Sequence, residues 1–156
     1  MTAPYLSDFM EIQPEWIDFN GHLNMAYYGV LFDQSVDQAF MEFGLGPEYR
    51  EKTGFTTYSA EFHIRYLREL HLGDRVRSSF QILDAGPKSF HFVQELIHED
   101  GWVAATGEGI TLHVDQSGPR VAPYPTEIKQ KIDAMAAAHA DLPVPEYVGK
   151  PMAIRR

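Results

Sequence analysis

The sequence predicts an α+β fold in which an antiparallel sheet wraps around one long helix. Two patterns predict it: a segment with apolar residues at helical spacing comes early in the chain, and four segments with a two-residue period follow it. A third observation is the length of 156 residues, which suits one domain with a single core. We expect this domain to cover residues 1–142 and a C-terminal tail to cover 143–156.

The first element that we expect is an irregular strand from about Phe9 to Asp18. Pro14 has no backbone N–H and therefore suits a strand at the edge of a sheet. The strand should end at Asn20-Gly21, a dipeptide typical of tight turns.

A helix of about five turns should start directly after this turn. Apolar side chains recur there at spacings of three and four residues, at Met25, Tyr28, Phe32, Val36, Phe40 and Phe43. Asn24 is a suitable N-cap, and the run Gly44-Leu-Gly-Pro47 should stop the helix.

Strands with alternating side chains come next, after a short connection. In the first of them, the apolar residues should share one face: Tyr58, Ala60, Phe62, Ile64 and Tyr66. Further strands are expected over about 74–84, 88–98 and 102–115, with a hairpin turn at Asp100-Gly101. Gly107 and Gly109 lie inside the last strand and predict a β-bulge, because a phosphate-binding loop would lead into a helix.

A second helix should close the fold over about Glu127 to Ala138, with Thr126 as its cap. After Leu142 the Pro-rich tail should lie on the surface as an arm. Because a single sheet of this size leaves an open edge and the long helix is apolar over much of its circumference, we expect a homodimer or a dimer of dimers.

The composition is that of a folded protein with an acidic surface. Asp and Glu number 22 against 13 Lys and Arg, a net charge of −9, so neither nucleic acid nor a membrane surface is an expected partner. The chain has no cysteine, which excludes disulfides and thiolate chemistry. The N-terminal residues lack a signal-peptide pattern and no apolar run approaches the ~20 residues of a membrane span, so we expect a cytoplasmic protein.

Polar residues gather where the long helix should begin, at Asp18, Gly21, His22, Asn24 and Met25. Free N–H groups of the first helical turn, around Met25, can stabilise the oxyanion that forms from a carbonyl group, and Asp18 supplies a carboxylate beside them. Such a pair can cleave an ester or a thioester. The structural alternative is that Asp18 and Asn24 only cap the turn and the helix and that His22 lies on the surface. The histidine spacings match no metal motif, and we expect no metal and no cofactor.

The segment Asp18-Phe-Asn-Gly-His-Leu-Asn-Met-Ala-Tyr-Tyr28 resembles the active-site segment of hotdog-fold acyl-CoA thioesterases of the 4-hydroxybenzoyl-CoA thioesterase type. The resemblance implies a hotdog fold, Asp18 as the catalytic carboxylate and the Met25 amide as the group that polarises the thioester carbonyl. A closer likeness is to betainyl-CoA thioesterases of carnitine degradation. It rests on the Asn-Gly-His-Leu run, on Glu61-Phe-His-Ile-Arg-Tyr-Leu67, on Leu112-His-Val-Asp115 and on Pro145-Glu-Tyr-Val-Gly149.

This resemblance implies an acyl-CoA substrate and therefore binding groups for its two ends. A trimethylammonium head would be held by aromatic rings and a carboxylate, for which the candidates are Trp16, Tyr27, Tyr58 and Glu61. Tyr28, also near the site in the sequence, is a further substrate-binding candidate. The phosphates of coenzyme A need cations, for which the candidates are Arg65, Arg68 and Lys88. Ordinary core packing of the rings and ordinary surface charge are the alternatives.

Two other functions stay open at this point. Asp18-x-Asn20-x-His22 partly matches the D-x-N-P-x-H signature of hotdog enoyl-CoA hydratases, but the gap between acid and imidazole is one residue shorter and the Pro is absent. A non-catalytic acyl-CoA-binding domain on the same fold is the other alternative. The sequence also leaves open whether Asp18 acts as a general base on water or as a nucleophile.

Overall fold

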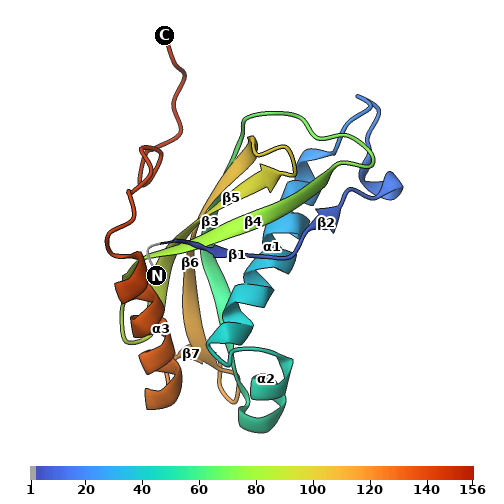
Figure 1. Cartoon of the computed structure of the whole chain (residues 1–156). Coiled ribbons are helices and arrows are strands. Elements are labelled where there is room, and N and C mark those ends of the chain that lie inside the picture. Colours follow the sequence, from blue (N-terminus) through green and yellow to red (C-terminus); the bar gives the residue numbers. More distant parts are fainter. Residues whose placement is uncertain (1–2) are drawn as a thin grey trace.

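A computed structural model describes residues 3–156, in which a curved antiparallel sheet lies against one long helix (Figure 1). The elements follow in the order β1 (Tyr5–Leu6), β2 (Met10–Glu11), a 3-10 helix (Pro14–Trp16), α1 (Met25–Glu42), α2 (Pro47–Thr53), β3 (Phe55–Tyr66), β4 (Arg75–Ala85), β5 (Ser89–His98), β6 (Val103–Asp115), β7 (Arg120–Val121) and α3 (Thr126–His139). The predicted α+β class, with a sheet around one long helix, is confirmed.

The strands pair in the order β1-β4-β5-β6-β3, and β2 and β7 add to β4 and β6. Every pair is antiparallel. The last strand of this path, β3, pairs with β6 along its whole length, so its second side forms an edge of the sheet.

The helix α1 forms where the sequence predicts it, and both of its ends have a local cause. Asn24 caps the N-terminus with its side chain, and Gly44 follows the C-terminus in a left-handed conformation with φ of 83°. One side of the helix is buried against the sheet, with Tyr28, Leu31, Phe32, Ser35, Ala39 and Phe40.

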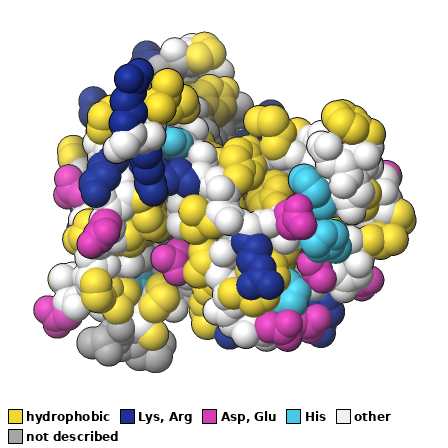
Figure 2. Space-filling view, turned by 90° about the horizontal axis from the view of Figure 1, so that it is seen from above, with side chains coloured by type: hydrophobic (Ala, Val, Ile, Leu, Met, Phe, Trp, Pro, Cys, Tyr) yellow, Lys and Arg dark blue, Asp and Glu magenta, His cyan; other side chains and the backbone are white. Residues whose placement is uncertain are grey.

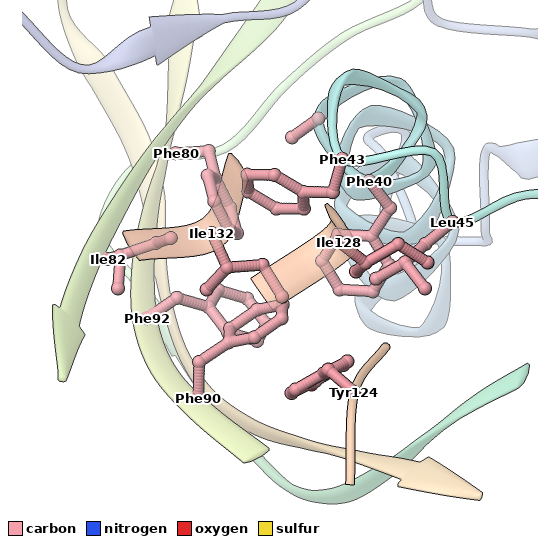
Figure 3. Close-up of a cluster of buried hydrophobic side chains, with 11 residues drawn as sticks. Phe40, Phe43, Leu45, Phe80, Ile82, Phe90, Phe92, Tyr124, Ile128 and Ile132 are labelled. Carbon is pink, nitrogen blue, oxygen red and sulfur yellow. The ribbon is translucent and has the colours of Figure 1, made fainter. Parts of the chain in front are cut away.

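The core has two parts along α1. At the C-terminal end of α1, Phe40 and Phe43 meet Phe80, Phe90 and Phe92 of the sheet, and α3 closes this cluster with Ile128 and Ile132 (Figure 3). At the N-terminal end a second cluster packs the helix start against the 68–76 segment and the sheet, with Ile12, Leu23, Tyr28, Leu31, Leu70, Val76 and Leu96 among its members. This second cluster fixes the place of the predicted site.

The expected strand from Phe9 to Asp18 is wrong for most of its length. Only Met10–Glu11 pairs with β4, and a 3-10 helix follows over Pro14–Trp16. Pro14 stands at the first position of that helix, where its fixed φ suits a helical turn and its missing N–H is not needed.

The connection between α1 and the first long strand is not a simple loop. The helix α2 begins at Pro47, ends at Gly54 with φ of 74°, and leads into β3, which starts at Phe55. This helix was not predicted, because Pro47 is as typical of the end of one helix as of the start of the next. At the closing helix, Pro125 rather than Thr126 is the N-cap, and no side chain caps it.

Register shifts occur in the pairs β3–β6, β4–β5 and β5–β6, but none falls at Gly107 or Gly109, so the predicted bulge there is wrong. The register of β3 against β6 shifts between Ser59 and Glu61. Paired residues of neighbouring strands point to the same face, so Tyr58, opposite Leu112, lies on the other face from Phe62, opposite Gly109. Tyr58 therefore does not share a face with Phe62, Ile64 and Tyr66.

Gly107 and Gly109 have a different structural reason. A Cβ on Gly107 would lie 2.7 Å from Phe62 Cζ, and one on Gly109 would lie 2.6 Å from Phe92 Cζ. These aromatic rings occupy the space in which a side chain would stand.

Across residues 3–156, no helix combines the length and the apolar character that crossing a membrane requires.

Candidate active site

The turn before α1 brings the predicted carboxylate next to the start of the helix. The Gly21 N–H donates to the Asp18 carbonyl over 3.0 Å, and the Asp18 N–H donates to the His22 carbonyl over 3.1 Å. Gly21 has φ of 81°, a conformation that side chains with a Cβ rarely adopt. The predicted turn is confirmed, and it reverses the chain between Asp18 and Asn24.

The Asp18 carboxylate is half-buried and accepts two hydrogen bonds. Its Oδ1 accepts from the Asn20 N–H over 2.8 Å, and its Oδ2 accepts from Asn24 Nδ2 over 3.1 Å. The other end of the same Asn24 amide, Oδ1, accepts from the Ala26 N–H over 2.9 Å. One side chain thus caps the helix and positions the carboxylate.

The first amide of α1 remains available for a ligand. Among residues 3–156, the Met25 N–H has no acceptor, whereas the Met25 carbonyl accepts from Tyr66 Oη over 3.1 Å. Free N–H groups at a helix N-terminus carry the positive end of the helix dipole. Such an amide can donate to a thioester oxygen and to the oxyanion that it becomes during attack.

A cavity of about 430 Å³ opens over this helix start. Three segments line it, namely the turn with α1, the end of β3 and the residues that follow β3. Its lining residues are Asp18, Asn20, His22, Leu23, Asn24, Met25, Tyr28, Tyr66, Leu67, Arg68 and Glu69. The cavity therefore brings the carboxylate, the free amide, two tyrosines and one guanidinium around a common space.

His22 lines this cavity, but its imidazole contacts other groups than Asp18. Its Nε2 lies 3.5 Å from Glu69 Oε2, and its Nδ1 lies 3.3 Å from the Leu23 carbonyl. Within the described residues, no hydrogen bond joins the side chains of Asp18 and His22, and no group of three potential ligands could hold a metal ion. The arrangement suits a lone carboxylate rather than an acid and imidazole pair.

Of the predicted substrate-binding residues, Tyr28 and Arg68 join Asp18 in the cavity. Tyr28 is only 4% exposed and meets the Tyr66 ring edge-on, with the ring centres 5.0 Å apart. The Arg68 guanidinium lies 4.0 Å over the Trp102 ring, a contact that holds it at the cavity wall.

Trp16 and Tyr27 stack on each other instead, with ring centres 5.6 Å apart and planes within 15°. They pack beside the second part of the core and do not line the cavity. Although these two residues are close to Asp18 in the sequence, they therefore do not lie at the site.

The other predicted binding residues lie elsewhere in the same chain. Tyr58 is separated from Tyr66 by most of β3, roughly 25 Å at the usual rise per strand residue. Lys88 lies at that same far end, where its carbonyl accepts from the His113 N–H. Glu61 and Arg65 line two cavities between β3 and the C-terminal tail.

Five further residues line the site that were not among the predicted site residues: Asn20, Leu23, Tyr66, Leu67 and Glu69. Tyr66 belongs to the predicted apolar strand face, and nothing in the neighbouring sequence indicates that its hydroxyl donates to the Met25 carbonyl. Glu69 had one usable signal, because it lies in the polar run Arg68-Glu-Leu-His71 directly after a predicted strand.

The fold and the geometry at the start of α1 agree with one class of protein, the thioesterases. The Thioesterase-like superfamily matches residues 12–132, and the chain belongs to this family. The predicted hotdog fold and the predicted type of enzyme, an acyl-CoA thioesterase, are thereby confirmed.

Two proteins with betainyl-CoA thioesterase in their names are similar to this chain. A betainyl-CoA thioesterase of Pseudomonas aeruginosa is 36% identical over 140 residues, which cover 89% of this chain and 88% of the relative. An L-carnitine dehydrogenase/betainyl-CoA thioesterase of Ruegeria pomeroyi is 34% identical over 100% of this chain, which spans only 31% of that longer relative.

Solved structures agree with the fold. The protein SAV2348 of Staphylococcus aureus, determined in complex with CoA, superposes with a TM-score of 0.91 at 28% identity over 99% of both chains. A thioesterase of Thermus thermophilus, complexed with coenzyme A and Zn, superposes with a TM-score of 0.73 over 88% of this chain and 98% of its own. Its identity is 24%, a likeness of fold alone.

Proposed function

We propose that this thioesterase hydrolyses betainyl-CoA to betaine and CoA, with Asp18 as the acting carboxylate. The observation that carries the site assignment is the hydrogen bond from Asn24, the helix cap, to Asp18 beside the free Met25 amide. The observation that supports the substrate is the likeness to betainyl-CoA thioesterases across nearly the whole chain.

The chemistry follows from these groups. The Met25 N–H donates to the thioester oxygen, which makes the carbonyl carbon more electrophilic and stabilises the oxyanion. Asp18 takes a proton from water as the water oxygen bonds to that carbon; the C–S bond then breaks, and the proton passes to the sulfur of CoA. In the nucleophilic alternative, Asp18 itself attacks the carbonyl carbon, the C–S bond breaks with CoA leaving as its thiolate, and water then cleaves the resulting anhydride at the Asp18 carbonyl. Single turnover in ¹⁸O-water separates the two, because only the second route puts label into Asp18.

A trimethylammonium head has no hydrogen-bond donor, so its binding depends on ring faces and negative charge. In the cavity, Tyr28, Tyr66 and Glu69 supply these groups, and they replace Trp16, Tyr27, Tyr58 and Glu61 of the same chain as our candidates. The net charge of −9 favours a cationic acyl group in addition.

The substrate proposal is tested by comparing betainyl-CoA with 3,3-dimethylbutanoyl-CoA, its neutral isostere. We expect kcat/KM to be at least about tenfold higher for betainyl-CoA, since cation–π contacts contribute about 0.5–2 kcal/mol each. Equal values, or a preference for the neutral compound, would remove the quaternary ammonium from the proposal and leave the thioesterase activity.

We also propose a homodimer, or a dimer of dimers, built on the free edge of β3. Residues 58–62 are exposed, and Met25, Phe62, Tyr66 and Leu67 add exposed apolar surface nearby. Two β3 strands pairing antiparallel around a two-fold axis would continue the sheet and carry Tyr58 of each copy toward the Tyr66 end of the other. Sedimentation at micromolar concentration should show no predominant 17.8 kDa species.

Thiol release from a panel of acyl-CoAs tests the two alternatives. A binding domain would release no CoA, and a hydratase would add water to an enoyl-CoA without releasing thiol. The separation of His22 from Asp18 speaks against the hydratase, which needs both groups on one substrate. A cytoplasmic location stays a prediction from the sequence.

A further inference from the structure

We propose that the C-terminal tail and the outer face of β3 form the site that binds the phosphate groups of a CoA thioester. This inference rests on the proposed function, since it names where the nucleotide end of that same substrate binds. The tail cations that it assigns, Lys150 and Arg155, lie outside the helix-start cavity.

The tail is fastened to the sheet by specific contacts. The Gly149 N–H donates to both carboxylate oxygens of Glu108 on β6, over 3.0 and 3.1 Å. Arg65 on β3 donates through Nη2 to the Lys150 carbonyl over 3.1 Å, and its guanidinium lies 5.5 Å from the centre of the Tyr147 ring. These contacts hold the backbone around Lys150 and leave the Lys150 side chain free to meet a ligand.

Between the tail and β3 lies a cavity of about 700 Å³, the largest of the described cavities. Arg65, Lys150 and Arg155 line it together with His63, and Glu146 is the single carboxylate in the lining. In a chain with a net charge of −9, this is a local reversal of charge. Figure 2 shows Lys and Arg side chains gathered on the side where the C-terminal segment rises in Figure 1.

Two polar atoms beneath the tail have unused hydrogen-bonding capacity. Arg65 Nη1 and Tyr147 Oη are both buried and without a partner in the described chain. Buried polar groups without partners are costly, and a guanidinium is the side chain best suited to a phosphate. Arg65 thus presents a donor that an anion in this cavity would satisfy.

The tail cavity adjoins the helix-start cavity. Tyr66 and Leu67 line both, so the end of β3 is a shared wall. A thioester held between Asp18 and the Met25 amide would pass its pantetheine arm over this wall, and its phosphates would reach Lys150 and Arg155. Among the basic residues predicted from the sequence, Lys88 lies at the far end of β3 and Arg65 at this one.

The test compares CoA with pantetheine as the leaving group, using one acyl group. Lys150→Ala with Arg155→Ala removes two cations and no backbone anchor. We expect the ratio of kcat/KM for the CoA thioester to that for the pantetheine thioester to fall at least about tenfold, mainly through KM, as for lost charge-assisted contacts. Lys52→Ala with Lys131→Ala removes the same charge elsewhere and should leave the ratio unchanged.

Direct binding makes the result independent of turnover. Calorimetric titration with free CoA should give a Kd at least about tenfold weaker for the tail variant than for the wild type and the control variant. Dephospho-CoA in the same titration shows how much of the loss belongs to the 3′-phosphate. An unchanged Kd and an unchanged ratio would overturn the tail site.

Failure of the proposed function and failure of the tail site would give different results. If the wild type binds CoA, the tail variant binds it more weakly and no acyl-CoA is hydrolysed, then the proposed function fails and the tail site stands. If the thioester is hydrolysed and both variants behave alike, the tail site fails and the function stands. If the wild type does not bind CoA, the tail site is overturned.

Discussion

Asn24 joins the start of the central helix to the carboxylate of Asp18. Its Nδ2 donates to Asp18 Oδ2 over 3.1 Å, and its Oδ1 accepts from the Ala26 N–H over 2.9 Å. Because one planar amide makes both bonds, the carboxylate cannot move independently of the helix N-terminus. The fold therefore holds the carboxylate that we propose as catalytic and the first amide of α1 as one unit.

Asp18→Asn should preserve the fold and lower kcat at least about 100-fold, the scale of losing a positioned base or nucleophile. The asparagine Oδ1 can still accept from the Asn20 N–H, which is why the turn should survive. Thiol release measures kcat, and thermal unfolding followed by circular dichroism measures the fold. Glu15→Gln, an exposed neighbour, is the control; ordinary turnover of Asp18→Asn would show that another group acts.

Replacing Asn24 separates capping from positioning. Asn24→Asp keeps an oxygen for the Ala26 N–H but loses the Nδ2 that donates to Asp18, so the cap should survive while kcat/KM falls at least about tenfold. Thiol release measures kcat/KM. Asn24→Ala loses the cap as well, at a cost of about 1 kcal/mol in the free energy of unfolding. A kcat/KM of Asn24→Asp equal to that of the wild type would make Asn24 a cap only.

Gly21→Val should destabilise the protein by about 1–2 kcal/mol and reduce turnover, because a residue with a Cβ is strained at φ of 81°. Nothing lies within 4 Å of the position of that Cβ, so the cost is one of backbone conformation and not of packing. Gly21→Asn is the matched control, since asparagine tolerates this region better. Urea unfolding that gives equal losses for Val and Asn would contradict this explanation.

The sequence predicts those parts of the fold in which apolar residues recur at a regular spacing over a long segment. The helix α1 and the strands β4, β5 and β6 have such a spacing, whereas α2 is short and begins with a proline that is equally typical of a stop. The bulge at Ser59 and Glu61 depends on pairing with β6, a partner some 50 residues away, and no local pattern reveals it.

The same distinction applies to the site. Asp18, Asn24 and Met25 lie in one short segment, so the turn and the cap predict from the sequence alone that they meet. Tyr66 and Glu69 line the cavity only because tertiary packing brings them there. Trp16 and Tyr27 stack on each other and do not line the cavity. Closeness in sequence was a good guide where backbone hydrogen bonds fixed the geometry and a poor one for aromatic side chains.

Gly109→Ala should destabilise the protein by about 1–3 kcal/mol, as expected for overpacking a core. The added Cβ would stand 2.6 Å from Phe92 Cζ and 2.9 Å from Phe62 Cδ2. Combining it with Phe92→Leu should recover part of this loss, since the shorter side chain vacates the space. Chemical denaturation of the two single variants and the double variant measures the coupling; strictly additive losses would show that the rings are not the obstacle.

His139 ties the C-terminal helix to the sheet and should make stability fall with acid. Its imidazole is 4% exposed, and its Nδ1 accepts from the Ile82 N–H over 3.0 Å. Burial lowers the pKa of His139 from its usual value, because the charged form loses solvation there.

The direction of the pH dependence follows from proton binding. Above the unfolded-state pKa of about 6.5, both states carry neutral His139 and the hydrogen bond is fully effective. Between that value and the lower pKa of the folded state, the unfolded chain binds more protons, so the free energy of unfolding falls by at most about 1.4 kcal/mol per pH unit. His139→Asn can accept from the Ile82 N–H with Oδ1 and does not titrate, so its loss from pH 7 to 5 should be smaller. Urea unfolding at fixed protein concentration measures this, with His63→Asn as control; parallel curves for His139→Asn and the wild type would rule out His139 as the source.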